Sequence, residues 1–481
     1  MNTLKLSGKT LCSLIAVVLF VVSMAGIVSA ATDGTTAGAT VCYGYTTLEP
    51  NQQQVYKLLH TAVQSDTPDT SVDISKWNIS EAELKSIVSI YVSDHPEAFW
   101  FQGLFLRGYG ADPNVSTSVI PIFELDGKLF TNKYYKATED TSDDNTPLYD
   151  ISELTKAKTE FQSASDAVIA EMNAANLRTD AEKALWLHDK VAALVSYVST
   201  NNDQTAYGAL VEKQAVCAGY TRLYQYLLQR VGIRSWAVTG VSVKPGASDP
   251  IAHAWNLVWL GDACVYTDVT WNDQDTKLYH LYYARNYDAF SGAGADHALD
   301  ALFDGRLPEC TAACAHQYLY NNPDVLLGDI TAQDIAARMV LGDDNKTFTA
   351  KFLDPSGKLT EWINTQENMR AVGSMLGCNG LSYSGSSMSG RVGVEIHLTL
   401  ISLTEVSAQK VVKGSVQCST ASPADLLTIE FIPENASEVK FSIRIAGCST
   451  EYALRNISSG TYTMRVTAPK HVPREYTVTI P

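Results

Sequence analysis

The chain has 481 residues, of which 46% are hydrophobic, so it is long enough for two to four domains with ordinary apolar cores. Its formal net charge of −16 argues against nucleic acid and anionic membrane surfaces as partners. The sequence contains no glycine-rich phosphate-binding loop, so we do not expect it to use a nucleotide.

The N-terminus has the pattern of a targeting segment. Lys5 and Lys9 precede an apolar run, which ends in small residues at Val28–Ala30. This pattern predicts a signal peptide over residues 1–30 and a secreted or cell-surface protein. The run is also long enough to span a bilayer, so an uncleaved membrane anchor is the alternative. Residues 31–48, rich in Thr, Gly and Ala, are predicted to be a linker.

Residues 49–150 are predicted to form a small α+β unit. Apolar spacing indicates a helix near Gln52–Gln64. A second helix is expected after Ser80, where Glu83 completes a capping box. The apolar segments Phe99–Phe101 and Ser118–Phe123 are predicted to be short strands.

The next region, residues 151–325, is predicted to be the catalytic domain. It should open with two helices, over 151–177 and 179–199, with Thr179 or Asp180 as the N-cap of the second. His188 lies on the apolar stripe of this second helix. We therefore expect His188 to be a satisfied core residue and not a catalytic one.

A cysteine stands where a third helix should begin. Apolar residues recur at helical spacing over residues 217–231, and Gly232 is a suitable residue to end the helix. Cys217 would therefore lie at the helix N-terminus, where unpaired backbone N–H groups and the helix dipole stabilise a thiolate.

A histidine and an aspartate follow on predicted strands. Strands are expected near Arg234–Val241, Ala252–Leu260 and Val265–Val269. His253 and Asp268 would then lie on neighbouring antiparallel strands that face the helix of the cysteine. A thiol, an imidazole and a carboxylate are the three groups that nucleophilic catalysis by cysteine requires.

These segments carry a resemblance to a known family. Three blocks in order are similar to the core of the transglutaminase-like superfamily: Cys217–Tyr220, His253–Asn256 and Tyr266–Asp273. The similarity covers roughly residues 150–325 and includes Leu187–Asp189, Tyr207–Leu210 and Asp296-His297. It implies an α+β, papain-like core in which the helix that carries Cys217 packs on an antiparallel sheet. In that core His253 would be the base and Asp268 the acid that orients it.

For the rest of the site the sequence offers candidate residues but does not select among them. The backbone N–H of the nucleophile would form half of an oxyanion hole, and its second donor could come from Gln204, Tyr207 or Gln214. Trp255 and Asn256 are expected to wall the cleft.

No cofactor is expected, and no metal site is predicted. The pair of cysteines at Cys310 and Cys314 lacks the second ligand pair that a zinc site needs.

Two further units complete the predicted architecture. Residues 326–402 should form an α+β accessory unit, with helices at 331–339 and 358–376, strands at 347–352 and 392–400, and a loop at 380–390. Residues 403–481 show strands of alternating polarity at short spacing, which predicts a β-sandwich. This segment resembles the Ig-like modules at the ends of secreted bacterial proteins, which implies surface attachment or spacing.

Together these observations predict an extracytoplasmic thiol enzyme that acts on peptide or protein amide bonds, with cell-wall peptide among the candidate substrates. Hydrolysis is favoured over cross-linking, because nothing indicates a lysine-binding tunnel or the long β-domain series of calcium-regulated transglutaminases. The alternative is a non-catalytic surface protein that binds a peptide or glycan in the same cleft.

Overall fold

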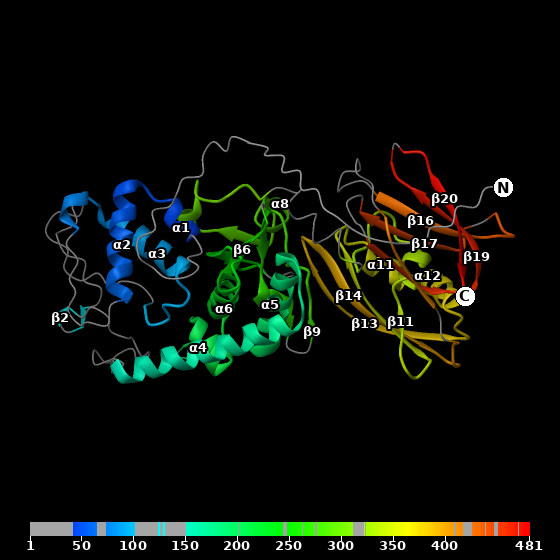
Figure 1. Cartoon of the computed structure of the whole chain (residues 1–481), viewed down its shortest axis with the longest axis horizontal. Coiled ribbons are helices and arrows are strands. Elements are labelled where there is room, and N and C mark those ends of the chain that lie inside the picture. The colour runs from blue at the N-terminus through cyan, green and yellow to red at the C-terminus, as the bar shows by residue number, and fades with distance from the viewer. Residues whose placement is uncertain are drawn as a thin grey trace, which may run out of the picture. The chain divides into compact units, whose positions relative to one another are not determined.

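The structure is a computed structural model, and its elements can be followed in Figure 1. It describes residues 42–481 except 65–73, 102–123, 126–127, 130–150, 201, 244–247, 262, 275–276, 311–321, 323, 408–409, 417–425, 438, 447–450 and 470. The predicted signal peptide and the strand predicted at 118–123 lie outside these residues. Contacts divide the chain into residues 1–39 and 40–481, and every described residue belongs to the second unit. Among the described residues, no helix has both the length and the apolar composition to cross a membrane.

The N-terminal unit is mainly helical in its described part. Its elements are α1 (Tyr43–Thr46), α2 (Pro50–Gln64), η1 (Ser75–Trp77), α3 (Glu81–Asp94), β1 (Glu124–Leu125) and β2 (Lys128–Leu129). The predicted capping box is confirmed, because Ser80 accepts from the Glu83 N–H while the Glu83 carboxylate accepts from the Ser80 N–H.

The strand predicted at Phe99–Phe101 is wrong. The Ala98 N–H bonds to the His95 carbonyl at 3.1 Å, and the Phe101 N–H bonds to the Ala98 carbonyl at 2.8 Å. These two local bonds curl the backbone into turns. The aromatic rings are buried by packing, and the centroids of the stacked Phe99 and Tyr207 rings lie 4.8 Å apart. Their apolar character therefore reflects burial of a turn and not pairing in a sheet.

The catalytic region begins with helices α4 (Ile151–Ala174) and α5 (Asp180–Leu194), and Thr179 is the N-cap of α5. Helix α5 ends earlier than predicted, because the chain continues into β3 (Ser196–Tyr197). This strand pairs in parallel with β4 (Gln214–Ala215), immediately before the cysteine helix. A short π-helix, η2 (Gly208–Glu212), lies between these two strands in the sequence.

The predicted helix α6 (Cys217–Arg230) and the antiparallel strands that follow it are confirmed. One sheet has the order β10-β5-β6-β7, formed by His297–Leu299, Ser235–Ser242, Ile251–Leu260 and Ala263–Thr267. Leu223 and Leu227 of α6 share a buried core with Val258 of β6 and Val265 of β7, which fixes the helix against the sheet. The intervening short elements are α7 (Val269–Asn272), β8 (Asp273–Gln274), β9 (Lys277–Leu278), α8 (Tyr287–Phe290) and η3 (Ala301–Phe303).

The accessory unit contains a four-stranded sheet of order β11-β12-β14-β13 with three helices. Its bounds are α10 (Ala332–Ala336), β11 (Val340–Leu341), β12 (Thr347–Asp354), α11 (Leu359–Asn364), α12 (Gln366–Met375), β13 (Leu381–Gly390) and β14 (Gly393–Ser402). The loop predicted at 380–390 is wrong, because β13 pairs with β14 along its whole length. β13 is a mostly exposed edge strand, so small polar side chains suffice and no apolar alternation marks it.

The turn between β13 and β14 packs into the catalytic region. Val392 is buried in the same apolar cluster as Trp255, and its carbonyl accepts from the Arg285 guanidinium. The Arg391 N–H donates to the Asp296 carboxylate at 2.9 Å. This hairpin therefore holds the residue that precedes His297.

The C-terminal region contains two sheets, consistent with the predicted sandwich. One pairs β15 with β18 and the other has the order β17-β16-β19-β20. The strands are β15 (Lys410–Ser415), β16 (Leu426–Pro433), β17 (Phe441–Ala446), β18 (Glu451–Ile457), β19 (Gly460–Thr467) and β20 (Arg474–Ile480).

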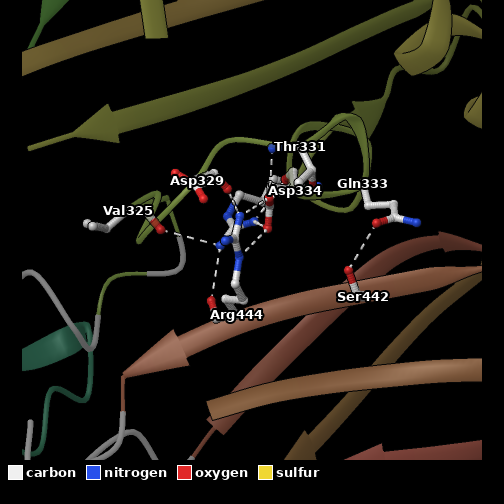
Figure 2. Close-up of polar contacts among 8 residues, drawn as sticks. Val325, Asp329, Thr331, Gln333, Asp334, Ser442 and Arg444 are labelled. Atoms are coloured by element: carbon white, nitrogen blue, oxygen red, sulfur yellow. Dashed lines mark hydrogen bonds and ion pairs between the residues drawn. The ribbon is translucent and has the colours of Figure 1, made fainter. Parts of the chain in front are cut away.

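Polar contacts join these strands to helix α10. Figure 2 shows the Arg444 guanidinium against the Asp334 carboxylate and the Ser442 hydroxyl against the side chain of Gln333. The buried Asn456 amide donates to the carbonyls of Ala336 and Met339 at 2.6 and 2.9 Å. The carbonyls at the end of α10 are thus satisfied from β18.

Candidate active site

The nucleophile is placed by the start of α6. Cys217 is the first residue of the helix, is half-buried and forms no disulfide. Val216, the N-cap, supplies no side-chain cap, and the N–H groups of Gly219 and Tyr220 bond back to its carbonyl. Within the described part of the chain, the N–H groups of Cys217 and Ala218 have no acceptor, so both are available to an oxyanion.

The two residues that complete the Cys217–Tyr220 block have structural roles. A Cβ on Gly219 would lie 2.4 Å from the Asp203 carbonyl oxygen, so only glycine lets this segment cross the helix N-terminus. Tyr220 is fully buried, and its hydroxyl lies 2.8 Å from both the Val195 carbonyl and the Asp273 carboxylate. These contacts fix the position at which the helix begins.

The imidazole and the carboxylate meet in the buried sheet. The Nε2 atom of His253, on β6, lies 2.7 Å from Oδ2 of Asp268, which follows β7. The other carboxylate oxygen accepts from the Trp271 N–H at 3.0 Å, because Asp268 is also the N-cap of α7. Since Nε2 is occupied, Nδ1 is the nitrogen that remains for the Cys217 thiol.

The charges of this pair are set by burial and by mutual attraction. Burial alone would lower the pKa of His253, but the Asp268 carboxylate and a hydrogen bond with Cys217 outweigh it and raise that pKa to about 9. Burial likewise opposes ionisation of Asp268, yet the positive His253 and two imidazole hydrogen bonds hold its pKa well below the usual range. At neutral pH His253 is therefore an imidazolium, with the Asp268 carboxylate on one side of the ring and the Cys217 sulfur on the other.

A second imidazole shares the carboxylate. Nε2 of His297, on β10, lies 3.1 Å from the same Oδ2 of Asp268. Its Nδ1 is buried and has no hydrogen-bond partner among the described residues. Burial lowers the pKa of His297 more than the Asp268 carboxylate raises it, so this ring is neutral and donates through Nε2. The backbone of β10 lies close to β5 at Gly240, where a Cβ would lie 2.0 Å from the Ala298 carbonyl oxygen.

The comparisons with known proteins bear on this region. Residues 168–276, which contain Cys217, His253 and Asp268, match the family model of the transglutaminase-like superfamily. This segment is a transglutaminase-like core.

No curated protein matches the chain. Among solved structures, one described as the crystal structure of a TGase is 14% identical, covers 28% of this chain and 36% of its own chain, and has a TM-score of 0.22. The present chain thus spans well under half of that protein's length.

The two residues that were predicted to wall the cleft are buried in the transglutaminase-like core. Trp255 is fully buried, and its ring centroid lies 5.9 Å from that of His253 and 4.9 Å from that of His297. Asn256 is also fully buried and donates to the Thr221 carbonyl of α6 at 3.0 Å. Trp255 packs beside the two histidine rings, and Asn256 joins β6 to α6. Because both side chains are fully buried, neither offers a surface to a substrate.

The three candidates for the second oxyanion donor lie in different places. Tyr207 packs on Phe99, and its hydroxyl donates to Glu160 at 3.2 Å, so its observed contacts give no support to a role at the thiol. Gln214 is exposed on β4, close before Cys217 in the sequence. Gln204 is exposed, and its amide donates to Asp203 at 2.9 Å. Gln204 and Gln214 remain candidates.

A second buried cluster supports the core from the opposite end of α7. The Asn272 amide oxygen accepts from the Tyr282 N–H at 2.9 Å, so its NH₂ group faces Nε2 of His188 at 3.0 Å. His188 must therefore carry its proton on Nδ1, which lies 2.8 Å from the Asp189 carboxylate. The prediction that His188 is a satisfied core residue is confirmed.

This arrangement also bears on metal binding. His188, Asp189 and His280 bring ligand atoms within 4.8 Å of one another, as do His253, Asp268 and His297. A metal on Nδ1 of His188 would move the ring proton to Nε2, where it would meet the NH₂ group of Asn272. The first group therefore fits a hydrogen-bonded network better than a metal. Of the cysteine pair considered for zinc, Cys310 is buried and Cys314 lies outside the described residues.

Sequence reasoning missed the role of His297. The Asp296-His297 pair was noticed only as part of the family resemblance. Its contact with Asp268 depends on the pairing of β10 with β5, which joins segments far apart in the sequence. A histidine directly after an aspartate, in a block that resembles the family, was the available signal.

Proposed function

We propose that the chain is an extracytoplasmic thiol enzyme that forms an acyl-enzyme on peptide or protein substrates, and that it acts mainly as an amide hydrolase. The observation that carries the proposal is the buried imidazolium of His253, held by Asp268 at 2.7 Å and hydrogen-bonded to Cys217 at the open N-terminus of α6. A structural cysteine has no need of a charged imidazole that is itself held by a buried carboxylate.

In the proposed reaction the thiol proton of Cys217 has passed to Nδ1 of His253, and the resulting thiolate attacks the amide carbonyl carbon. The resulting oxyanion accepts from the N–H group of Cys217 and from a second donor, which is the N–H group of Ala218 or the side chain of Gln204 or Gln214. His253 then donates its Nδ1 proton to the departing nitrogen, the C–N bond breaks, and a thioester remains on the sulfur. Asp268 keeps the Nε2 side of the ring paired throughout, so that only Nδ1 exchanges a proton.

The second half of the reaction decides between hydrolysis and cross-linking. His253, now neutral, takes a proton from the acceptor as it attacks the thioester, the C–S bond breaks, and the thiolate–imidazolium pair is regenerated. Water as the acceptor gives a carboxylic acid, whereas an amine gives a new amide. We favour water, because nothing in the sequence indicates a tunnel for a lysine side chain.

The non-catalytic alternative keeps the same cleft and assigns it to peptide or glycan binding. It predicts a thiol of ordinary reactivity. The location outside the cytoplasm, the cell-wall peptide as a substrate and the attachment role of residues 403–481 are parts of the proposal that rest on sequence patterns alone.

The deciding experiment is the rate of iodoacetamide labelling at Cys217, followed by mass spectrometry near neutral pH. Cys378 is a suitable internal control, because burial raises the pKa of its thiol. We expect Cys217 to react at least about tenfold faster than Cys378, and His253→Ala to remove the difference. A Cys217 rate no higher than that of free N-acetylcysteine under the same conditions would support the binding protein instead, because its raised pKa makes Cys378 slower than an ordinary thiol. Release of new amino groups from casein by the wild type, and not by Cys217→Ala, would identify the hydrolase.

A further inference from the structure

The guanidinium of Arg222 lies near the thiol without an anionic partner. Arg222 follows Cys217 in α6, is half-buried, and donates from one terminal nitrogen to the backbone carbonyl of Gln204 at 2.5 Å. Within the described part of the chain, no carboxylate lies within ion-pair distance of it. The ionisable group beside it is the Cys217 thiol.

Asp203, the acid next to the carbonyl that Arg222 contacts, does not neutralise this cation. The carboxylate of Asp203 is buried, and one of its oxygens accepts from the Ser199 hydroxyl at 2.8 Å and the Thr200 N–H at 3.1 Å. The other oxygen accepts from the Gln204 amide at 2.9 Å. Asp203 is therefore committed to its own turn.

Another arginine of the same helix shows the usual arrangement. Arg230 donates to the Asp166 carboxylate at 2.6 Å and also bonds to the Ser165 hydroxyl. Arg222 differs because its contact is a single neutral carbonyl. Burial lowers the pKa of Arg222 to about 10, and the adjacent sulfur of Cys217 partly offsets this, so the group stays positive at neutral pH. A half-desolvated cation without a counter-ion is costly for a fold, and such groups concentrate at binding sites.

We propose that Arg222 binds a carboxylate of the substrate chain next to the amide that Cys217 attacks, so that the preferred substrates are acidic peptides. The inference deepens the proposed function and rests on it. A guanidinium has five N–H donors in a planar arrangement. Among the described residues Arg222 uses one of them, in its bond to the Gln204 carbonyl, so it can still form a bidentate pair with a carboxylate. The chain carries a formal net charge of −16, which repels acidic ligands. The positive charge of Arg222 next to the thiol would offset that repulsion at the point where the substrate reacts.

The test compares two small reagents that alkylate the same sulfur. Iodoacetate carries a carboxylate and iodoacetamide is its neutral analogue, so the ratio of their rates at Cys217 reports anion recognition independently of thiol reactivity. We expect Arg222→Gln to lower the iodoacetate-to-iodoacetamide ratio about three- to tenfold, while the iodoacetamide rate stays within about twofold. Arg222→Lys should keep most of the ratio, since it keeps the charge. Arg230→Gln removes the same unit of charge from the same helix and should leave the ratio unchanged.

Bromoacetyl peptides then identify the source of the carboxylate. Bromoacetyl-glutamate amide against bromoacetyl-glutamine amide tests an acidic side chain. Bromoacetyl-glycylglycine with a free or an amidated end tests a terminal carboxylate. Arg222-dependent preference in either pair supports the inference and names the group that is bound.

The outcomes separate the two proposals. If Cys217 reacts no faster than Cys378 with either reagent, the proposed thiol chemistry fails. If Cys217 is reactive but its ratio is the same in the wild type and Arg222→Gln, the acidic-substrate inference is overturned. An equal loss of both rates in Arg222→Gln would also overturn it, because the guanidinium would then only support the thiolate. Should Arg222→Gln not fold, rising salt should lower the wild-type ratio, and a salt-independent ratio would count against anion recognition.

Discussion

Replacing Asp268 with asparagine tests the buried carboxylate directly. Oδ2 accepts from the rings of His253 and His297, and Oδ1 accepts from the Trp271 N–H. An amide has one oxygen and one NH₂ group. If the amide oxygen takes the place of Oδ2, the NH₂ group faces the Trp271 N–H. If the oxygen takes the place of Oδ1, the NH₂ group faces both imidazoles. Neither orientation can satisfy all three donors.

The expected cost follows from that conflict. The side chain of Asp268 is 1% exposed, so water cannot replace the lost acceptor. Leaving a buried donor unsatisfied, together with the loss of a charged hydrogen bond, should lower the free energy of unfolding by about 2–4 kcal/mol. The main contribution that raises the pKa of His253 also disappears, so the imidazolium should be lost at pH 7 and Cys217 alkylation should slow at least about tenfold. A small residual turnover should survive, because the imidazole can still visit the correct tautomer.

Asp189 provides a matched control. Its carboxylate also lies between two imidazoles, at 2.8 Å from His188 and 2.7 Å from His280, but its side chain is 41% exposed. Water can hydrate the asparagine there, so Asp189→Asn should change stability by no more than about 1 kcal/mol and leave Cys217 reactive.

The assay for stability is denaturant unfolding of the full chain, monitored by tryptophan fluorescence. Reactivity is measured by thiol labelling of the folded variants. Equal destabilisation by Asp268→Asn and Asp189→Asn would refute the reasoning from burial. Undiminished labelling of Cys217 in Asp268→Asn would refute the assignment of Asp268 as the group that charges His253.

Four other outcomes are expected. His297→Leu should slow Cys217 alkylation about tenfold and His297→Gln, which can still donate an N–H, should recover most of the rate; two equally slow variants would argue against a donor role. The pKa of His253 is raised from 6.5 to about 9, so its stabilising contribution is complete below pH 6.5 and is lost as pH rises through 9. The stability difference between wild type and His253→Gln should therefore shrink over that window, and a constant difference in urea titrations would contradict this. Asn456→Ala should lower the melting temperature through two lost bonds worth about 2–3 kcal/mol and leave Cys217 labelling intact; loss of labelling would show that β18 braces the catalytic region. Intact mass of the exported chain should begin near Ala31, and a chain that retains residues 1–30 would indicate a membrane anchor.

The sequence was sufficient for the catalytic elements because their signals are local. The start of α6 at Cys217, the capping box at Ser80 and the antiparallel strands around His253 each follow from residues within one or two turns of chain. The resemblance of the three blocks to the transglutaminase-like superfamily then implied how the helix packs on the sheet.

The failures share a physical cause, which is dependence on distant partners. β13 contains mainly Gly and Ser and forms a strand because β14 offers a full ladder of backbone hydrogen bonds. His297 has a role only because β10 joins the sheet beside β5. The aromatic residues at Phe99–Phe101 are buried by packing of a turn and not by strand pairing. Propensity and periodicity do not report such contacts.

The hairpin between β13 and β14 limits how this transglutaminase-like core could be transferred to another protein. The family match ends at residue 276, yet the second imidazole on Asp268 comes from His297. Asp296, its neighbour, is held by the backbone of Arg391. A hybrid protein that borrowed only residues 168–276 would lack that imidazole, and one cut at residue 325 would expose the cluster that Val392 seals. A segment that keeps the complete site must therefore extend through β14. The accessory unit has to be included with the core, because its hairpin holds Asp296 and covers the apolar cluster.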